Sequence, residues 1–438
     1  MPGKLQYRSI KNCNGTGLGV RMAGFAAWHR WLRSLPPTRC HPKAVLWLAL
    51  AGCVALSLAD SSRAAEPQQI KIGYLRAPLA KERISLIDIP TANEGLAGAQ
   101  LAIEDNNTTG RFVGQQFELI DILLKDGEDP TAAVNKLADQ NVAFIATALP
   151  AAQLLQAADA GKARGEIFIN ASAPDERLRE QDCRANLIHV APTRFMLADG
   201  LAQYLILKKW RRWLLVSGSH DNDKLMADAY RHAAKRFGAK IVAELEFKDT
   251  GGARRTDSGI AEIQRQMINL TQGAPDYDIL VAADESEVFA GYLPYRTWLP
   301  RPVAGSAGLV PTTWNAAFDQ WGALQLQNRF RKQFQRFMTP LDMQLWTAIR
   351  MVAEAASRAN TSDTAKLFAF IKSPEFSVAA FKGQKLTLRD WNLQLRQPIL
   401  LFDGRNTVSI SPQEGFLHQV SELDTLGLDR PETKCKLN

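Results

Sequence analysis

The sequence has few of the residues from which catalytic and metal sites are usually built. Its 438 residues include 5 cysteines and 6 histidines. The histidines beyond residue 65, which are His189, His220, His232 and His418, lack the spacing of metal ligands. No HExxH sequence, phosphate-binding loop or nucleophile elbow is present. We therefore expect no enzymatic activity, no cofactor and no bound metal.

Long apolar runs are also missing. The longest uncharged apolar stretch covers residues 44–59, which is shorter than the ~20 residues that a membrane-spanning helix needs. Nine Lys and Arg residues but only one acid, Asp60, lie in residues 1–65 around this stretch. Basic residues, a short apolar run and then small residues are typical of an export signal.

The net positive charge of the chain is confined to this leader. The whole sequence has 53 Lys and Arg against 45 Asp and Glu, so residues 66–438 hold 44 of each. A near-neutral body gives no reason to expect nucleic-acid binding, although the sequence pI is about 9.2.

The site at which the leader ends is open. Cleavage after Ala59 or after Ala64 fits the small residues that a signal peptidase reads, and Met22 is an alternative start. Residues 50–53 (LAGC) also have the form of a lipoprotein box, which would acylate Cys53. Because the residues after Cys53 stay apolar, we favour release as a soluble protein over anchoring.

Only two cysteines, Cys183 and Cys435, follow the leader. In an oxidising compartment they would form a single disulfide that pins the C-terminal segment to the body of the protein. The alternative is two unpaired thiols.

Strand-like and helix-like segments alternate along residues 70–282, which indicates parallel βαβ units. Roughly 370 residues follow the leader, more than the ~250 to 300 that one hydrophobic core supports, so we expect two lobes. The first block has strands at 70–75, 117–124, 142–146 and 167–170, with helices at 91–106 and from Asp129-Pro130 to 137. The second has helices at 196–207, 224–237 and 260–270, with strands at 213–217, 241–247 and 278–282.

After residue 311 the pattern changes to longer helices. Segments 324–337 and 342–359 carry apolar residues at three- and four-residue steps, which predicts core-facing stripes. The stripes comprise Phe330, Phe334 and Phe337, then Leu345, Ile349, Val352 and Ala356. Segments 397–402 and 407–410 are expected to form a hairpin, with its turn at Asp403-Gly404.

The order of these segments resembles that of a known family. The matching stretches are NNTTGRFVG at 106–114, DPTAAVNKLADQNVAFIATA at 129–148, FINASAPDERL at 168–178 and IHVAPT at 188–193. They resemble the type I periplasmic substrate-binding proteins of ABC importers, in the branched-chain amino-acid receptor branch. The similarity extends over residues 70–420.

Four further stretches resemble one subfamily, the binding proteins associated with pyrroloquinoline-quinone-dependent alcohol dehydrogenase systems. They are YLPYRTWLPRPVAG at 292–305, GALQLQNRF at 322–330, QLRQPILL at 394–401 and SPQEGFLH at 411–418 with ELDTLGLDRPE at 422–432. This resemblance implies a role beside periplasmic alcohol oxidation.

The family resemblance implies two doubly wound Rossmann-like lobes joined by three crossovers near Pro192, Trp321 and Phe381. Lobe 1 would comprise residues 66–191 and 322–380, lobe 2 residues 192–321 and 381–420, and a tail residues 421–438. It also implies a monomer in the periplasm that closes its lobes over a small molecule and is recognised by a membrane permease. An accessory or sensor subunit using the same lobes without transport is the alternative, favoured by the unusual tail.

Ligands of open α/β sheets bind at the carboxyl ends of the strands, so residues there are the candidate ligand-binding residues. They are Ser172, His220, Asp221, Asp284, Glu285 and Tyr292. Each also has a structural explanation: a turn hydroxyl for Ser172, helix capping for the charged residues, and packing for Tyr292 with Tyr295 and Trp298.

The sequence departs from the amino-acid receptors at two places where those receptors hold the zwitterion. Residues 147–151 (TALPA) lack their glycine and serines, and residues 305–308 (GSAG) lack an acid. We therefore expect a more apolar or differently charged ligand than a branched-chain amino acid. Arg76 and Arg83, after the first strand, either pair with an anion or lie on the surface.

Overall fold

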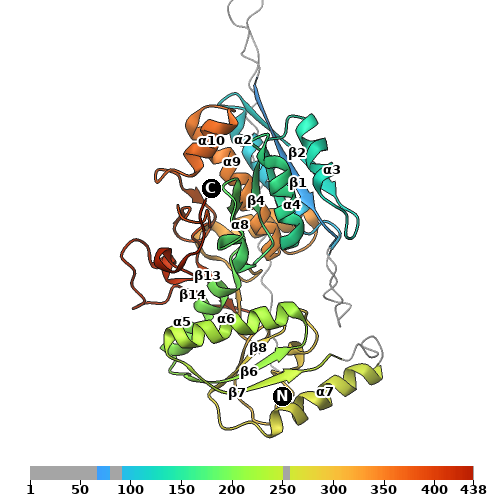
Figure 1. Cartoon of the computed structure of the whole chain (residues 1–438), viewed down its shortest axis with the longest axis vertical. Helices are drawn as coiled ribbons and strands as arrows, with labels where there is room; N and C mark the ends of the chain where they lie inside the picture. Colours follow the sequence, from blue (N-terminus) through green and yellow to red (C-terminus); the bar gives the residue numbers. More distant parts are fainter. Residues whose placement is uncertain (1–66, 79–90, 250–256, 438) are drawn as a thin grey trace, which may run out of the picture. The chain divides into compact units, whose positions relative to one another are not determined.

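The computed structural model describes residues 67–78, 91–249 and 257–437. Within these ranges the chain forms two parallel β-sheets, each flanked by helices on both faces, which confirms the two-lobe α/β fold (Figure 1). We call the first sheet with its helices lobe 1 and the second sheet with its helices lobe 2.

The sheet of lobe 1 has five parallel strands in the order β2-β1-β3-β4-β5. Its register pairs Ile72 of β1 with Phe144 of β3, and Phe144 in turn with Ile167 of β4. All four residues of β4 are buried, as a parallel strand covered on both faces requires. The strands are β1 (Gln68–Arg76), β2 (Gln115–Leu123), β3 (Phe144–Ala148), β4 (Ile167–Asn170) and β5 (Leu187–His189).

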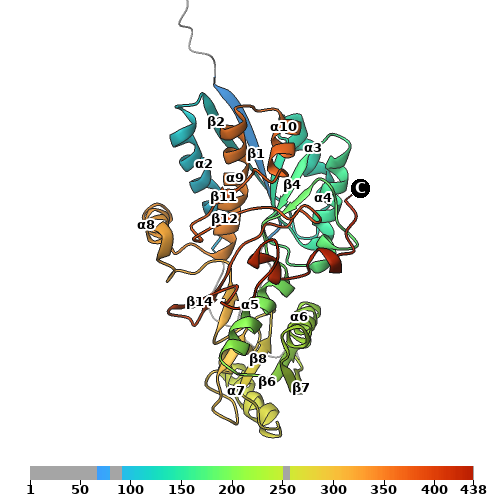
Figure 2. The ribbon, with the colours of Figure 1, turned by 90° about the vertical axis from the view of Figure 1, so that its left-hand side faces the viewer.

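Alternate residues of β1 face two separate cores. Ile72 and Tyr74 pack with helices α2 (Leu96–Gly110) and α9 (Pro340–Ala359). Leu75 packs on the other face with helices α3 (Thr131–Asp139) and α4 (Ala151–Lys162). Figure 2 shows α2 beside α9 on one side of the sheet and α3 with α4 on the other.

Close contact between α2 and α9 depends on a glycine. A Cβ atom added at Gly98 would lie 2.0 Å from the backbone oxygen of Asp342. The buried Asp342 carboxylate accepts hydrogen bonds from the backbone N–H groups of Gly95 and Gly98 at 2.8 and 3.3 Å. The start of α9 is thereby fixed to the start of α2.

Lobe 2 contains four parallel strands in the order β7-β6-β8-β9. Helices α5 (Arg194–Leu207) and α6 (Asp221–Phe237) cover one face, and α7 (Asp257–Gln272) lies on the other. The strands are β6 (Arg212–Gly218), β7 (Lys240–Phe247), β8 (Ile279–Ala283) and β9 (Val303–Gly305).

A small antiparallel sheet packs against α5. Its strands are ordered β10-β13-β14, with bounds Val310–Thr312, Ile399–Phe402 and Thr407–Ser411. The predicted hairpin of β13 and β14 is therefore present, with Asp403 and Gly404 in its turn. Helices α8 (Ala323–Phe334) and α10 (Thr364–Ile371) and the hairpin β11 (Val378–Ala379) with β12 (Lys385–Leu386) complete the regular elements after β10.

Several elements differ from the sequence-based prediction. Helices α4 and α10 and the short strands β9, β10 and β11 were not predicted. Helix α8 ends at Phe334, so Phe337 lies beyond it and is 57% exposed instead of facing the core. Helix α2 begins at Leu96, five residues later than predicted, because residues 92–95 form turns.

The C-terminal segment connects both lobes. Thr425 accepts a hydrogen bond from Gln203 of α5 at 2.9 Å, whereas Thr433 donates one to Glu180 of lobe 1 at 3.0 Å. Cys435 is bonded to Cys183, with 5.7 Å between their Cα atoms.

No helix in the described ranges has the length and apolar character needed to cross a bilayer. The predictions on the export signal, its cleavage, Met22 and Cys53 concern residues outside those ranges.

Candidate functional site

Ser172 lies in the turn that follows β4. Its backbone N–H donates to the Asn170 side chain at 3.1 Å, and its half-buried hydroxyl donates to the Leu149 carbonyl at 3.4 Å. The second contact is long for a hydroxyl hydrogen bond. Ser172 is therefore placed beside the loop between β3 and α4, with a hydroxyl that a closer partner would readily attract.

The N-terminus of α4 lies at the same edge of the sheet. Pro150 precedes the helix and provides no side-chain cap. The first N–H groups of a helix have no partners inside the helix and carry a partial positive charge. Ser172 and the start of α4 together form an edge that suits a carboxylate or carbonyl oxygen.

Arg194, the first residue of α5, links the two lobes at the strand ends. Its guanidinium donates to both oxygens of Glu285, which follows β8, at 2.6 and 2.8 Å. It also lies 3.6 Å from the carboxylate of Asp175, in the loop that follows Ser172. Although Arg194 is 1% exposed, its Nη1 atom has no hydrogen-bond partner.

His220 and Asp221 lie at the start of α6, after β6. The His220 ring nitrogen Nε2 is 2.7 Å from the carboxylate of Asp249, which follows β7. Asp221 extends into solvent and lies 3.7 Å from Lys224 one helical turn later. His220 thus takes part in an inter-strand contact, whereas Asp221 belongs to the exposed first turn of the helix.

Asp284 is buried after β8 and has a structural role. Its carboxylate accepts three backbone hydrogen bonds, from Val288, Phe289 and Ala290, at 2.7 to 2.9 Å. Burial raises the pKa of Asp284, and these amide bonds oppose that shift. The capping explanation applies here, so we do not retain Asp284 as a ligand contact.

Asp223 is a buried acid in the same region that the sequence did not single out. Its carboxylate accepts from the backbone N–H groups of His220 at 3.2 Å and Ser286 at 2.9 Å. A Cβ added at Gly218 would lie 2.1 Å from it. Asp223 therefore ties the end of β6 to the loop after β8.

The aromatic candidates lie further along that loop. Tyr292 is partly buried in the short 3₁₀ turn Ala290–Tyr292, and burial raises its pKa. Tyr295 and Trp298 are 86% and 52% exposed.

Arg76 is paired inside lobe 1, since it donates to both carboxylate oxygens of Asp121 at 2.8 and 2.9 Å. Neither of the alternatives considered from the sequence, an anion contact or a solvated surface position, describes this pairing. Arg83 lies outside the described ranges.

Three candidates and one new residue therefore gather at the sheet edges: Ser172 in lobe 1, His220 and Glu285 in lobe 2, and Arg194 between them. Sequence reasoning missed Arg194 because its partners lie 91 and 19 positions away along the chain. A charged residue directly after the capping Thr193 was the available signal. No group of three or more metal-binding side chains converges in the described residues.

The family model described as "Periplasmic binding protein" matches residues 89–282. This range runs from the approach to α2 to the end of β8 and so includes Ser172, Arg194 and His220. No curated protein shows a significant sequence match.

Several solved structures have the same fold. A periplasmic binding protein from Burkholderia mallei is 14% identical, with a TM-score of 0.61 over 84% of this chain and 99% of that one. A branched-chain amino-acid ABC transporter ligand-binding protein from Burkholderia xenovorans is 17% identical, with a TM-score of 0.61 over 79% and 92%. An R. palustris solute-binding protein in complex with benzoate is 12% identical, with a TM-score of 0.59 over 84% and 100%. The fold is thus that of the type I periplasmic binding proteins.

Proposed function

We propose that this protein is a periplasmic receptor that closes its two lobes over a small molecule and delivers it to the permease of an ABC transporter. The observation that carries the proposal is the arrangement of Ser172, Arg194 and Glu285, which places polar groups of both lobes at the strand ends of one α/β fold. Ligands bind at this edge in open α/β sheets, and lobe closure is hinge motion. The receptor would act as a monomer.

The geometry favours a carboxylic acid over an amino acid as the ligand. The uncapped start of α4 and the Ser172 hydroxyl would hold a carboxylate. An α-ammonium group needs a free acid, yet Glu285 is paired with Arg194 and Asp284 accepts three backbone hydrogen bonds. The related R. palustris protein was crystallised with benzoate, which has a carboxylate and no ammonium group.

A link to pyrroloquinoline-quinone-dependent alcohol oxidation is the finer part of the proposal. Its support is the resemblance of residues 292–305, 322–330, 394–401 and 411–432 to that subfamily. Oxidation of alcohols and aldehydes yields carboxylic acids, the ligand class that the site favours.

An accessory or sensor subunit of the alcohol dehydrogenase system is the second candidate function. The contacts of the C-terminal segment with both lobes favour it, because such a connection restrains lobe opening. A protein partner would then replace the permease.

Thermal-shift measurements on the purified protein with matched acids, aldehydes, alcohols and amino acids test the proposal. A ligand that binds only the folded state raises the midpoint by mass action, so a rise of several degrees with a carboxylic acid, absent for the alcohol of the same skeleton, is expected. If an amino acid gives the largest shift, the ligand class is wrong. If no small molecule shifts the midpoint and a protein partner co-purifies, the accessory role replaces the receptor.

A further inference from the structure

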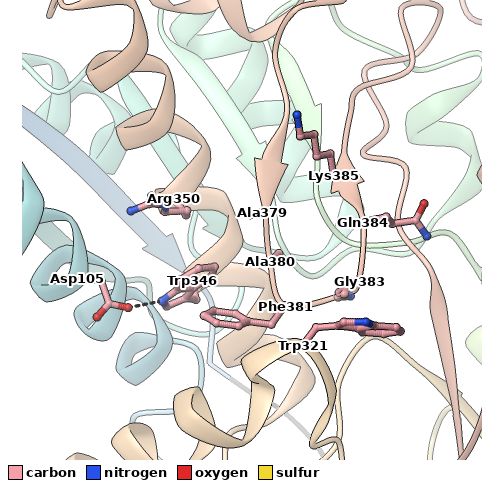
Figure 3. Close-up of a pocket in the computed structure, with 11 residues that line it drawn as sticks. Asp105, Trp321, Trp346, Arg350, Ala379, Ala380, Phe381, Gly383, Gln384 and Lys385 are labelled. Atoms are coloured by element: carbon pink, nitrogen blue, oxygen red, sulfur yellow. Dashed lines mark hydrogen bonds between the residues drawn. The ribbon is translucent and has the colours of Figure 1, made fainter.

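A cavity of about 700 Å³ lies beside α2 and α9 of lobe 1, and none of the candidate strand-end residues lines it. It lies between α2, α9 and the β11–β12 hairpin (Figure 3). Trp321, which precedes α8 in the chain, also borders it. The cavity volume falls within the ~300 to 1,000 Å³ of ordinary ligand pockets. Trp346, Ala380 and Phe381 of its lining pack in the core of lobe 1, and Trp321 and Phe381 lie where crossovers between the lobes are predicted.

Three aromatic rings form one end of this cavity and are held in place. The Trp346 Nε1 atom donates to Asp105 at 3.0 Å, and the ring centroids of Trp346 and Phe381 are 5.4 Å apart. The indole of Trp321 packs against Gly383 so closely that a Cβ atom at residue 383 would lie 2.5 Å from it. Trp321 is nevertheless 52% exposed, so a rigid aromatic face remains uncovered.

The backbone at these aromatic residues adopts a conformation that non-glycine residues rarely take. Trp321 has φ 49° and Phe381 has φ 56°, both in the left-handed region. Such conformations cost free energy and persist where the surrounding structure imposes them, often at functional sites. Here they place the two rings on facing segments, with Phe381 beside Gly322 and Trp321 beside Gly383.

The charge that remains in the cavity is positive. The only lining carboxylate, Asp105, already pairs with Arg329 and Trp346. Lys385 has no carboxylate partner within the described part of the chain, whereas Arg350 is paired with Glu354 at 3.0 Å and Lys382 donates to the neutral Gln397 side chain. Figure 3 shows Lys385 above the rings on the hairpin side, whereas Arg350 lies beside Trp346 on α9, across the strand that carries Ala379.

We propose that this cavity is a second binding site, for a flat aromatic carboxylate. The rings of Trp321 and Phe381 would stack on the ligand, and Lys385, unpaired among the described residues, would meet its carboxylate. The ligand needs both an aromatic ring and a negative charge, so a neutral aromatic compound or an aliphatic anion would bind poorly. The proposal is independent of the receptor role of the strand-end site.

Isothermal titration of the full protein with naphthalene-2,6-dicarboxylate tests the site. Naphthalene-2,6-dimethanol keeps the ring and removes the charge, and adipate keeps the charge and removes the ring. The dicarboxylate should bind at least about tenfold more tightly than either. Equal affinity for the dicarboxylate and adipate, or no heat with any probe, would overturn the proposal.

Three variants locate the binding. Lys385→Gln removes one exposed charge and should weaken the dicarboxylate about fivefold, and Trp321→Ala should weaken it about tenfold. Lys366→Gln, on the exposed face of α10, is the matched control and should leave affinity unchanged. Thermal unfolding checks that each variant is folded.

A crystal structure of the dicarboxylate complex separates the two sites. Density between Trp321 and Lys385 supports the proposal. Density only beside Ser172, with affinity lowered by Ser172→Ala and not by Lys385→Gln, would place the probe at the strand ends. That outcome would overturn the second site and leave the receptor proposal intact.

Discussion

Two buried arginine–carboxylate clusters in this protein share the same chemistry but differ in how completely their hydrogen-bonding groups are paired. In the tail cluster, Arg389 and Arg396 both donate to Asp424 at 2.8 to 2.9 Å, and Arg389 also donates to three backbone carbonyls. In the strand-end cluster, Arg194 binds Glu285 but leaves Nη1 without a hydrogen bond.

The two clusters differ in whether every hydrogen-bonding group of the arginine has a partner. We take the fully paired cluster to be structural and the incompletely paired one to be adaptable. Asp424 is fully buried, so any rearrangement would expose a charge to an apolar interior. The Glu285 side chain is 25% exposed and Asp175 lies 3.6 Å from the buried Arg194, so Arg194 keeps a carboxylate neighbour when Glu285 turns to water. We infer that the tail cluster is fixed and that the Arg194 cluster can change partners when a ligand enters.

Replacement of Asp424 by Asn should have the largest effect. Two buried guanidinium groups would lose their counter-charge, and the free energy of unfolding should fall by about 3 to 5 kcal/mol. Urea unfolding followed by circular dichroism measures this. Asp390→Asn, which removes an exposed partner of Arg430, is the control and should have no measurable effect. Equal small losses in both variants would show that the tail cluster is not structural.

Removal of the disulfide tests the attachment of the same tail. Cys183→Ser with Cys435→Ser opens a link across 252 residues and should cost about 2 to 5 kcal/mol of unfolding free energy. A reducing agent should lower the stability of the parent protein and not of the variant. Non-reducing mass spectrometry should show one linked peptide pair, and two alkylatable cysteines would contradict the bond.

Lys382 extends the comparison to a buried cation without any carboxylate. Burial lowers its pKa from 10.5 to about 7, and its ammonium donates to Gln397 at 2.7 Å. Between these pH values the unfolded state binds more protons than the folded state, so stability should rise with pH. We expect a rise on the order of 3 kcal/mol from pH 7 to pH 10, seen by denaturant unfolding. Lys382→Met should flatten the profile, and exposed Lys366→Met should not.

Replacement of Glu285 by Gln sharpens the contrast with Asp424. The neutral amide still reaches Arg194, so the loss of stability should be about 1 to 2 kcal/mol. Of the ion pairs described for Arg194, only the longer one with Asp175, 3.6 Å away, would then remain, so titration calorimetry should show tighter binding of a carboxylic acid. Glu262→Gln, on exposed α7, provides the control. A loss of stability as large as that of Asp424→Asn would refute the distinction.

Ser172→Ala should have the smallest effect on stability, no more than about 1 kcal/mol, since its hydrogen bond to Leu149 is long. It should nevertheless weaken the ligand identified by thermal shift, because a hydroxyl at the strand ends is lost. Unchanged affinity would remove Ser172 from the site. Ser377→Ala, just before β11, controls for loss of a hydroxyl elsewhere in lobe 1.

The regular elements could be predicted from the sequence where their periodicity is strong. Strand β4 was predicted with its observed bounds, and Leu345, Ile349 and Val352 form the predicted buried stripe of α9. Helix α4 was missed because its alanine-rich sequence (AAQLLQAADAGK) contrasts little between its faces. Strands of three residues, such as β9 and β10, are too short to show alternation.

The sequence predicted which strands the candidate residues follow, but not the residues with which they pair. Ser172, His220 and Glu285 follow β4, β6 and β8, and their contact with a ligand stays a prediction. The partners of these residues depend on contacts between segments far apart in the chain, which periodicity does not encode. Arg194 bonded to Glu285 is the clearest example, because the two residues lie 91 positions apart along the chain.

The Cys183–Cys435 bond also sets an order of events during biogenesis. Cys435 follows every strand of both sheets along the chain, so under the proposed periplasmic role it would reach the oxidising compartment after all of them. A chain exported in this way could not close the link until both lobes had crossed the membrane. A product that stops short of Cys435 would keep a lone thiol at Cys183, open to mixed disulfides and to the quality-control oxidoreductases that act on them.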